Sequence, residues 1–274
     1  MHRTIVLLAT AMLAMALYLA NMAWWIETEI LDPERFVATT VEAMEDDTTR
    51  DAAAAIIVDK LADEFPLLRL LESALVGLFS DLLGRDVIEP LIVTTSADVH
   101  RRIIEGDQSA LIVNLDPYRE LLLAPLESLS PELAARVPED WFRAVEVFEE
   151  GTLRDLSTYA RNTRTTAIAA TLLSIGLVVT LFVQSKTWSS AFMAVGFAFV
   201  LAGGISALIV PGARSTAAVF VEDEPGTVLL TGVFDAFTQP LTSRSLAILA
   251  AGGLLFVVGL LGWLINSGRR SVTA

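Results

Sequence analysis

Three apolar runs in the C-terminal part of the chain decide its fold: Thr166–Val183 (TAIAATLLSIGLVVTLFV), Trp188–Val210 (WSSAFMAVGFAFVLAGGISALIV) and Leu246–Ile265 (LAILAAGGLLFVVGLLGWLI). None of them contains Asp, Glu, Lys or Arg, and each is close to the roughly 20 residues that a helix needs to cross a bilayer. A fourth run, Ile5–Ile26, lies near the N-terminus. The sequence therefore predicts an α-helical membrane protein with four transmembrane helices.

These runs divide the chain into nine predicted segments. They are a cytoplasmic N-terminus (1–4), a first transmembrane helix (5–26), an acidic extracytoplasmic helical domain (27–164), a second transmembrane helix (165–184), a cytoplasmic turn (185–187), a third transmembrane helix (188–210), an extracytoplasmic loop (211–244), a fourth transmembrane helix (245–265) and a cytoplasmic tail (266–274).

The first run could also be a signal peptide, because Ala14-Met15-Ala16 has the small-x-small pattern of a cleavage site. The anchor is the better interpretation. The run continues past that site to Ile26, and Trp24 and Trp25 suit the membrane interface.

Charge is concentrated in the segment between the first two runs. The whole chain has a net charge of −14, whereas residues 26–165 hold 29 acidic and 13 basic side chains, a net charge of −16. Such a domain argues against nucleic acid and against anionic lipid headgroups as partners. The chain has no cysteine, which excludes disulfides, thiol catalysis and thiolate metal sites.

Helical signals dominate this acidic segment. Asp32-Pro33-Glu34 predicts a helix start, and later helices are expected over Thr49–Asp63, Pro66–Leu83 and from a capping box at Asp86–Glu89 to Glu105. The Pro66–Leu83 helix has a wide apolar stripe that Arg69, Glu72 and Asp81 interrupt, so we expect a buried spine of the domain and not a membrane span.

Two β-branched stretches predict a small two-stranded β ribbon, which would pair Ser109–Leu115 with Trp141–Phe148. Thr152–Asp155 is expected to cap a helix that runs into the second span.

This order of elements resembles uncharacterised actinobacterial-type four-span membrane proteins with a helical extracytoplasmic domain between spans one and two. The residues that carry the resemblance are Leu31–Thr39 and Leu111–Leu123, followed by the three clustered spans. The resemblance implies the topology and no particular activity.

Short basic segments predict the orientation. Arg3, Lys186, Arg269 and Arg270 would all be cytoplasmic if both termini are inside. Arg161 and Arg164 lie on the opposite side and count against this orientation, although long translocated domains largely escape the rule.

Candidate chemical groups are few, and we assign no catalytic, cofactor-binding or metal-binding residue. His2 is terminal, and His100 is expected at the surface beside Arg101 and Arg102. The acidic clusters Glu45-Asp46-Asp47, Glu149-Glu150 and Glu222-Asp223-Glu224 lack EF-hand spacing and are interpreted as solvated charge. Paired carboxylates for glycoside chemistry stay an open alternative.

The spans contain no ionisable side chain, which disfavours a coupled transporter. Small residues instead recur at fourfold spacing, which predicts close packing of the helices. These stripes are Thr166, Ala170 and Ser174 in the second span, Ala194, Ala198, Ala202 and Ser206 in the third, and Ala247 and Ala251, with Gly259, in the fourth.

The resulting hypothesis is a multi-pass protein of the plasma membrane whose outer domain docks a partner or senses the exterior without catalysis. The expected partners are the lipid bilayer and another membrane or envelope protein, with no nucleic acid and no cofactor; a homo-oligomer stays open. The alternatives are an envelope enzyme acting on a cell-wall or lipid substrate, or an accessory subunit of a larger membrane complex. The apolar stretch Val228–Phe237 is expected to fold, at least in part, against the domain or the membrane surface.

Overall fold

The computed structural model divides the chain into two compact units. The membrane unit comprises Met1–Thr28, Arg161–Ala213 and Thr238–Ala274, and the insert unit comprises Glu29–Ala160 and Arg214–Phe237. The structure describes residues 2–138, 141–143, 145–148, 157–218 and 223–271. The chain therefore passes from one unit to the other four times.

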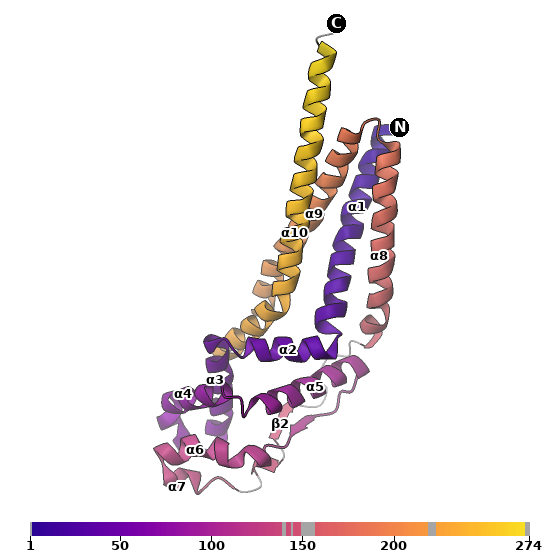
Figure 1. The fold of residues 1–274 in the computed structure, drawn as a ribbon. Coiled ribbons are helices and arrows are strands. Elements are labelled where there is room, and N and C mark those ends of the chain that lie inside the picture. Colours follow the sequence, from indigo (N-terminus) through magenta and orange to yellow (C-terminus); the bar gives the residue numbers. More distant parts are fainter. Residues whose placement is uncertain (1, 139–140, 144, 149–156, 219–222, 272–274) are drawn as a thin grey trace. The chain divides into compact units, whose positions relative to one another are not determined.

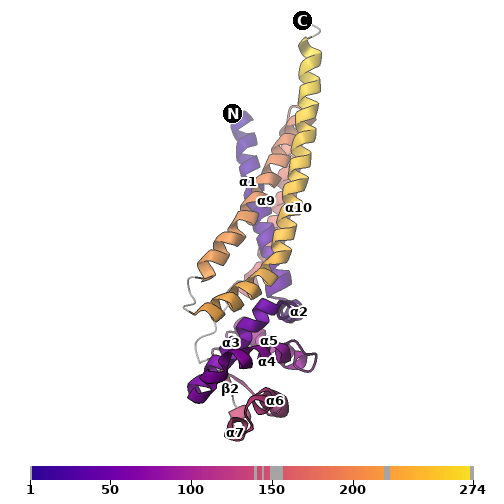
Figure 2. The same ribbon diagram turned by 90° about the vertical axis from the view of Figure 1, so that its left-hand side faces the viewer.

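Four helices that are long and apolar enough to cross a bilayer form the membrane unit (Figures 1 and 2). They are α1 (His2–Trp25), α8 (Ser157–Gln184), α9 (Trp188–Ala218) and α10 (Glu224–Ser271). The apolar stretches of these helices have mean hydropathies of 2.0, 2.3, 2.3 and 2.5 in that order. The chain is thus an α-helical membrane protein with four candidate spans, as the sequence predicted.

Glycines bring α9 and α10 into backbone contact. A Cβ atom at Gly203 would lie 2.7 Å from both the Leu249 nitrogen and the Ser245 oxygen, closer than real Cβ atoms approach. The same is true of Gly259, whose Cβ would lie 2.6 Å from the Met193 nitrogen. Gly196 and Gly252 are crowded by the facing backbone in the same way.

The spacing explains this contact. Gly196 and Gly203 are seven residues apart on α9, and Gly252 and Gly259 are seven apart on α10. Residues at this spacing lie on one helix face, so each helix presents a row without side chains to its neighbour.

The predicted small-residue stripes are only partly at interfaces. Ala198, Ala202 and Ser206 on α9 are buried, as are Ala170 and Ser174 on α8. Thr166 is exposed, and so are Ala247 and Ala251 of the stripe predicted for α10, whereas Gly259 of that stripe lies at the contact with α9. The contact face of α10 runs through Ser245, Gly252 and Gly259, because glycine and not alanine permits the observed approach.

Three helices of the insert unit have clear start or stop signals in the sequence. Helix α2 (Pro33–Ala43) starts after Asp32, whose carboxylate accepts a hydrogen bond from the Arg35 amide at 2.9 Å, as predicted. Helix α3 (Asp47–Glu64) is capped by Asp46 in the same way and starts earlier than predicted. Helix α5 (Glu89–Glu105) ends at Gly106, which has a left-handed φ of 74°.

The capping box predicted at Asp86–Glu89 does not form. Ile88 occupies the cap position of α5 and gives no side-chain hydrogen bond. Ile88 is 1% exposed and belongs to the apolar core, so packing of this side chain decides the local geometry.

The remaining elements of the insert unit are short. They are the 3₁₀ helices η2 (Pro66–Leu71), η3 (Asp116–Tyr118) and η4 (Trp141–Arg143), the helices α4 (Glu72–Leu83), α6 (Arg119–Leu129) and α7 (Pro131–Ala134), the π-helix η1 (Ile26–Ile30), which crosses the unit boundary, and the strands β1 (Leu111–Val113) and β2 (Val145–Phe148). The two strands pair antiparallel, with Ile112 opposite Glu146 and an irregularity next to Leu111. Both strands are shorter than the stretches predicted from the sequence.

The stretch Pro66–Leu83 supplies the centre of the insert core, as predicted. Leu68, Leu75, Phe79 and Leu82 are all at most 4% exposed and pack with residues of α3, α6 and the segment around Phe142. The stretch is not one helix, however. It starts as a 3₁₀ helix and becomes α-helical at Glu72.

Most of the predicted loop 211–244 is helical. Helix α9 continues past Pro211 to Ala218, and α10 starts at Glu224 and contains Pro240. Each proline lacks an N–H and crowds the preceding turn. The unit boundaries after Ala213 and Phe237 lie within three residues of these prolines, so each boundary falls where the helical hydrogen bonding is weakened.

Replacement of Gly252 tests the contact between α9 and α10. A Cβ atom there would lie 2.6 Å from Phe199 Cβ and from the Val200 nitrogen. We expect Gly252→Ala to destabilise the protein by about 1–3 kcal/mol, because backbone must move to accept the methyl group. The measurement is thermal unfolding of the full chain in one detergent.

Gly253→Ala is the matched control, because no atom lies within 4 Å of a Cβ there. This variant should unfold at or above the temperature of the parent, since alanine is the better helix former by about 1 kcal/mol. Equal stability of the two variants would contradict the close contact.

Candidate functional site

The environment of His100 is a buried contact inside the insert unit. Its side chain is 6% exposed, and its Nε2 atom lies 3.0 Å from the carbonyl oxygen of Ile30. Its ring centroid lies 5.0 Å from that of Phe36 on α2. The predicted surface position was therefore wrong.

The helical period explains the buried position of His100. Ile92, Ser96 and His100 recur every four residues on α5, and Ser96 and His100 are both buried. Arg101 and Arg102 are turned away by about 100° per residue and reach the acids on the outer side. The neighbouring residues Arg101 and Arg102 therefore did not indicate that the His100 side chain points into the insert unit.

The first turns of α10 also pack into the insert unit. Phe237 is 8% exposed, and its ring centroid lies 5.0 Å from that of Phe36. A Cβ atom at Gly232 would collide with Thr49 of α3, and Arg214 forms a 2.9 Å ion pair with Asp235. This confirms that part of the stretch Val228–Phe237 folds against the domain.

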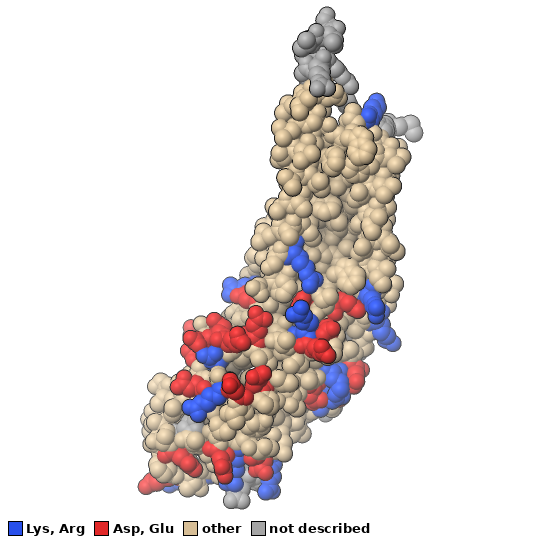
Figure 3. All heavy atoms as spheres, viewed as in Figure 1, with Lys and Arg blue, Asp and Glu red and all other residues tan. Residues whose placement is uncertain are grey.

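Charged side chains gather over the insert unit, whereas the helices of the membrane unit show few on the face in Figure 3. Several of the described acids have structural partners. Asp46 accepts hydrogen bonds from the amide and hydroxyl of Thr49, and the backbone hydrogen bond is the main cause that lowers its pKa. Asp47 pairs with Arg50, and Asp223 accepts from the Gly226 amide at 2.8 Å. Glu149, Glu150 and Glu222 lie outside the described residues.

Asp98 is the centre of the densest ion-pair group. Burial alone would raise its pKa, but hydrogen bonds from Arg102 and Arg101 outweigh this and hold the pKa below its ordinary value. Arg102 also reaches Asp107 and the Ser109 hydroxyl. Arg102 thereby ties the end of α5 to the segment that leads into β1. Among the described residues, no group of three or more His, Asp and Glu side chains is arranged to hold a metal ion.

A polar contact joins three helices of the membrane unit. Asn21 of α1 donates from Nδ2 to the hydroxyl of Ser245 at 3.1 Å and lies 3.4 Å from the hydroxyl of Ser206. All three side chains are at most 8% exposed. Hydrogen bonds between helices in an apolar bundle contribute about 0.6–2 kcal/mol each, so this contact fixes the register of α1 against α9 and α10. The sequence pattern of small residues located Ser206 but not its partner Asn21.

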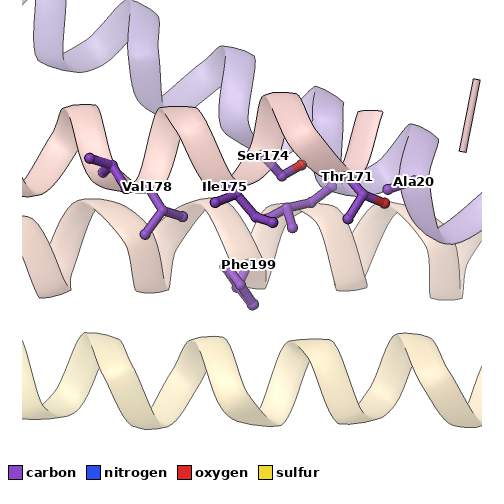
Figure 4. A pocket seen from close by; sticks show the side chains of 8 residues that line it. Ala20, Thr171, Ser174, Ile175, Val178 and Phe199 are labelled. Carbon is purple, nitrogen blue, oxygen red and sulfur yellow. The ribbon is translucent and has the colours of Figure 1, made fainter. Parts of the chain in front are cut away.

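An apolar groove of about 280 Å³ lies between α1, α8 and α9 (Figure 4). Its lining includes Ala20, Thr171, Ser174, Ile175, Val178 and Phe199. The two hydroxyl groups are used within the protein. Thr171 donates to the Ala167 carbonyl and Ser174 to the Ala170 carbonyl, both at 2.8 Å, and Trp24 Nε1 donates to Thr171 at 3.1 Å.

Comparisons with models of known protein families, with curated proteins and with solved structures gave no match to this chain. The functional argument therefore depends on the geometry of the two units.

Replacement of His100 by Phe tests the role of its hydrogen bond. Phe keeps an aromatic ring next to Phe36 but removes the group that binds the Ile30 carbonyl. A buried acceptor that loses its partner costs about 1–3 kcal/mol, and we expect that loss of stability in thermal unfolding of the full chain. Arg101→Gln, at an exposed neighbour, should change the unfolding temperature much less. Unchanged stability of His100→Phe would contradict a structural role.

Proposed function

We propose that this chain is a multi-pass protein of the cell envelope whose insert unit is extracytoplasmic and docks a partner or senses the exterior without catalysis. The observation that supports this most is that helix α10 belongs to both units. Its first turns contact α2 and α3 through Phe237 and Gly232, and its later turns contact α9 through Gly252 and Gly259.

This shared helix connects the unit that would bind the partner to the membrane helices. The Phe237 contact in the insert unit and the glycine contacts in the membrane unit lie on one continuous helix. A partner that binds one conformation of α10 more tightly than another would therefore act on both sets of contacts.

The surface of the insert unit supports docking of a protein. Its acidic side chains favour a basic surface and disfavour nucleic acid. Among the described residues, its exposed large apolar side chains are Leu70, Val87, Ile112 and Leu129, which come from four different elements or turns. A partner would therefore be recognised mainly by charge, with single apolar contacts added. The resemblance to actinobacterial-type four-span proteins stays part of this proposal.

The proposed orientation places both termini in the cytoplasm, and labelling of single cysteines tests it. The natural chain has no cysteine. Ala97 on α5 and Gln184 at the end of α8 are both exposed. We expect an impermeant thiol reagent to label Ala97→Cys and not Gln184→Cys on intact cells, and both in opened membranes. Labelling of Gln184→Cys alone on intact cells would reverse the orientation.

Photo-crosslinking in native membranes tests docking. A photoreactive amino acid would replace Leu70, Val87, Ile112 or Leu129 in the full chain, one position at a time, with Val183 on α8 as an exposed control in the membrane unit. We expect at least one insert position to capture a protein that Val183 does not. Capture should fall as salt rises, because salt screens exposed charges beyond about 10 Å at 0.1 M.

The alternatives give different results in the same assay. Capture only from Val183 would indicate an accessory subunit held through the membrane helices. A single carboxylate-to-amide change that abolishes the cellular phenotype, while folding and capture persist, would indicate an envelope enzyme and overturn the docking proposal.

A further inference from the structure

The groove of the membrane unit continues toward two arginines on α8. Arg164, Thr171 and Val178 are each seven residues apart, so they lie on the same helix face. Thr171 and Val178 line the groove, and Arg164 lies about two helical turns before Thr171, the first α8 residue of the lining. Arg161 lies one further turn away, and both arginines are exposed.

The uncharged part of α8 matches the thickness of the hydrocarbon core of a bilayer. Helix α8 has no charged residue between Arg164 and its end at Gln184, and these 20 residues span about 30 Å, the thickness of the hydrocarbon core. Arg164 is then at the level where hydrocarbon meets headgroups. Thr171 lies about 10 Å deeper than Arg164, and Ile175 lies near the bilayer midplane.

We propose that this groove and Arg164 together bind one phospholipid from the leaflet on the side of the insert unit. The acyl chain lies in the groove, and the phosphate pairs with Arg164, with Arg161 one turn further from the hydrocarbon. This site is independent of the partner that docks on the insert unit.

The chemistry of the groove fits an acyl chain. The Thr171 and Ser174 hydroxyls donate to carbonyls of their own helix, so these hydrogens are not available to a ligand. Trp24 is 40% exposed and its indole donates to Thr171, so the Thr171 hydroxyl oxygen also has a partner within the protein. The groove holds about 280 Å³. A partner helix is about 10–12 Å wide with its side chains and would need a broader surface.

The charge of the two arginines fits a phosphate. Among the described residues, neither Arg161 nor Arg164 forms an ion pair, although acids are abundant in this chain. Guanidinium groups bind phosphate oxygens through two parallel hydrogen bonds. The pair also opposes the positive-inside trend in the proposed orientation, and a lipid phosphate gives it a local role. The acidic insert disfavours further negative charge, so a zwitterionic phospholipid fits best.

Native mass spectrometry of the full chain tests the proposal, with dioleoyl phosphatidylethanolamine or dioleoylglycerol added to the detergent. We expect one retained phosphatidylethanolamine per chain. Ile175→Trp should abolish this retention, because Ile175 lines the groove, is 56% exposed and can be enlarged without overpacking the core. Leu172→Trp is the matched control, since Leu172 is 64% exposed but lies outside the lining.

Arg164→Gln tests the phosphate contact. We expect retention of phosphatidylethanolamine to fall about tenfold, the effect of losing one hydrogen bond to a charged group, with retention of dioleoylglycerol unchanged. Lys186→Gln, at the other end of α8, should change neither. An equal effect of Arg164→Gln on both lipids would overturn the phosphate assignment.

Two further outcomes would overturn the groove assignment. One is retention by Ile175→Trp equal to that of Leu172→Trp, in protein whose unfolding temperature matches the parent. The other is a change of oligomeric state in Ile175→Trp with lipid retention intact, which would assign the groove to a helix of a second copy. If Ile175→Trp does not fold, Val179→Trp replaces it, because Val179 also lines the groove and is 56% exposed.

Discussion

Helix α10 makes two different kinds of contact along one continuous backbone, and both units depend on it. Before Pro240 it presents large side chains, of which Phe237 packs against Phe36 in the insert unit with the two rings tilted. After Pro240 it presents glycines, and its backbone touches that of α9. In water, apolar area drives the first contact. Between lipid tails that driving force is absent, so only close approach and hydrogen bonds can hold α9 and α10 together.

The features that could be predicted from the sequence are those set by local chemistry. The spans follow from length and lack of charge, since a helix is the way a single segment satisfies its backbone in lipid. The start of α2 follows from Asp32 and Pro33, and the turn after α5 from Gly106. The core role of Pro66–Leu83 follows from its stripe, because charges on the other face exclude a span.

The features that could not be predicted depend on which face of a helix meets a neighbour. Ala247 and Gly252 are equally compatible with a small-residue stripe. Only the close approach of α9, which leaves no room for a Cβ atom, selects Gly252. His100 was assigned to the surface because of two adjacent arginines, although the helical period turns it toward Ile30. Asn21 has no repeating pattern, and its contact with Ser206 and Ser245 joins residues far apart in the sequence.

The polar groups of the membrane unit divide into those that hold helices together and those that remain at the surface. Asn21, Ser206 and Ser245 are buried together, where a hydrogen bond replaces an unsatisfied group in hydrocarbon. Thr171 and Ser174 return their hydrogens to α8, and this leaves an apolar lining although two of its residues are polar by type. Arg164 forms no ion pair with the described residues of the bundle. A cation at the level of the headgroups, above an apolar groove on the same helix face, selects for a molecule that has an anionic group at one end and a long hydrocarbon chain at the other.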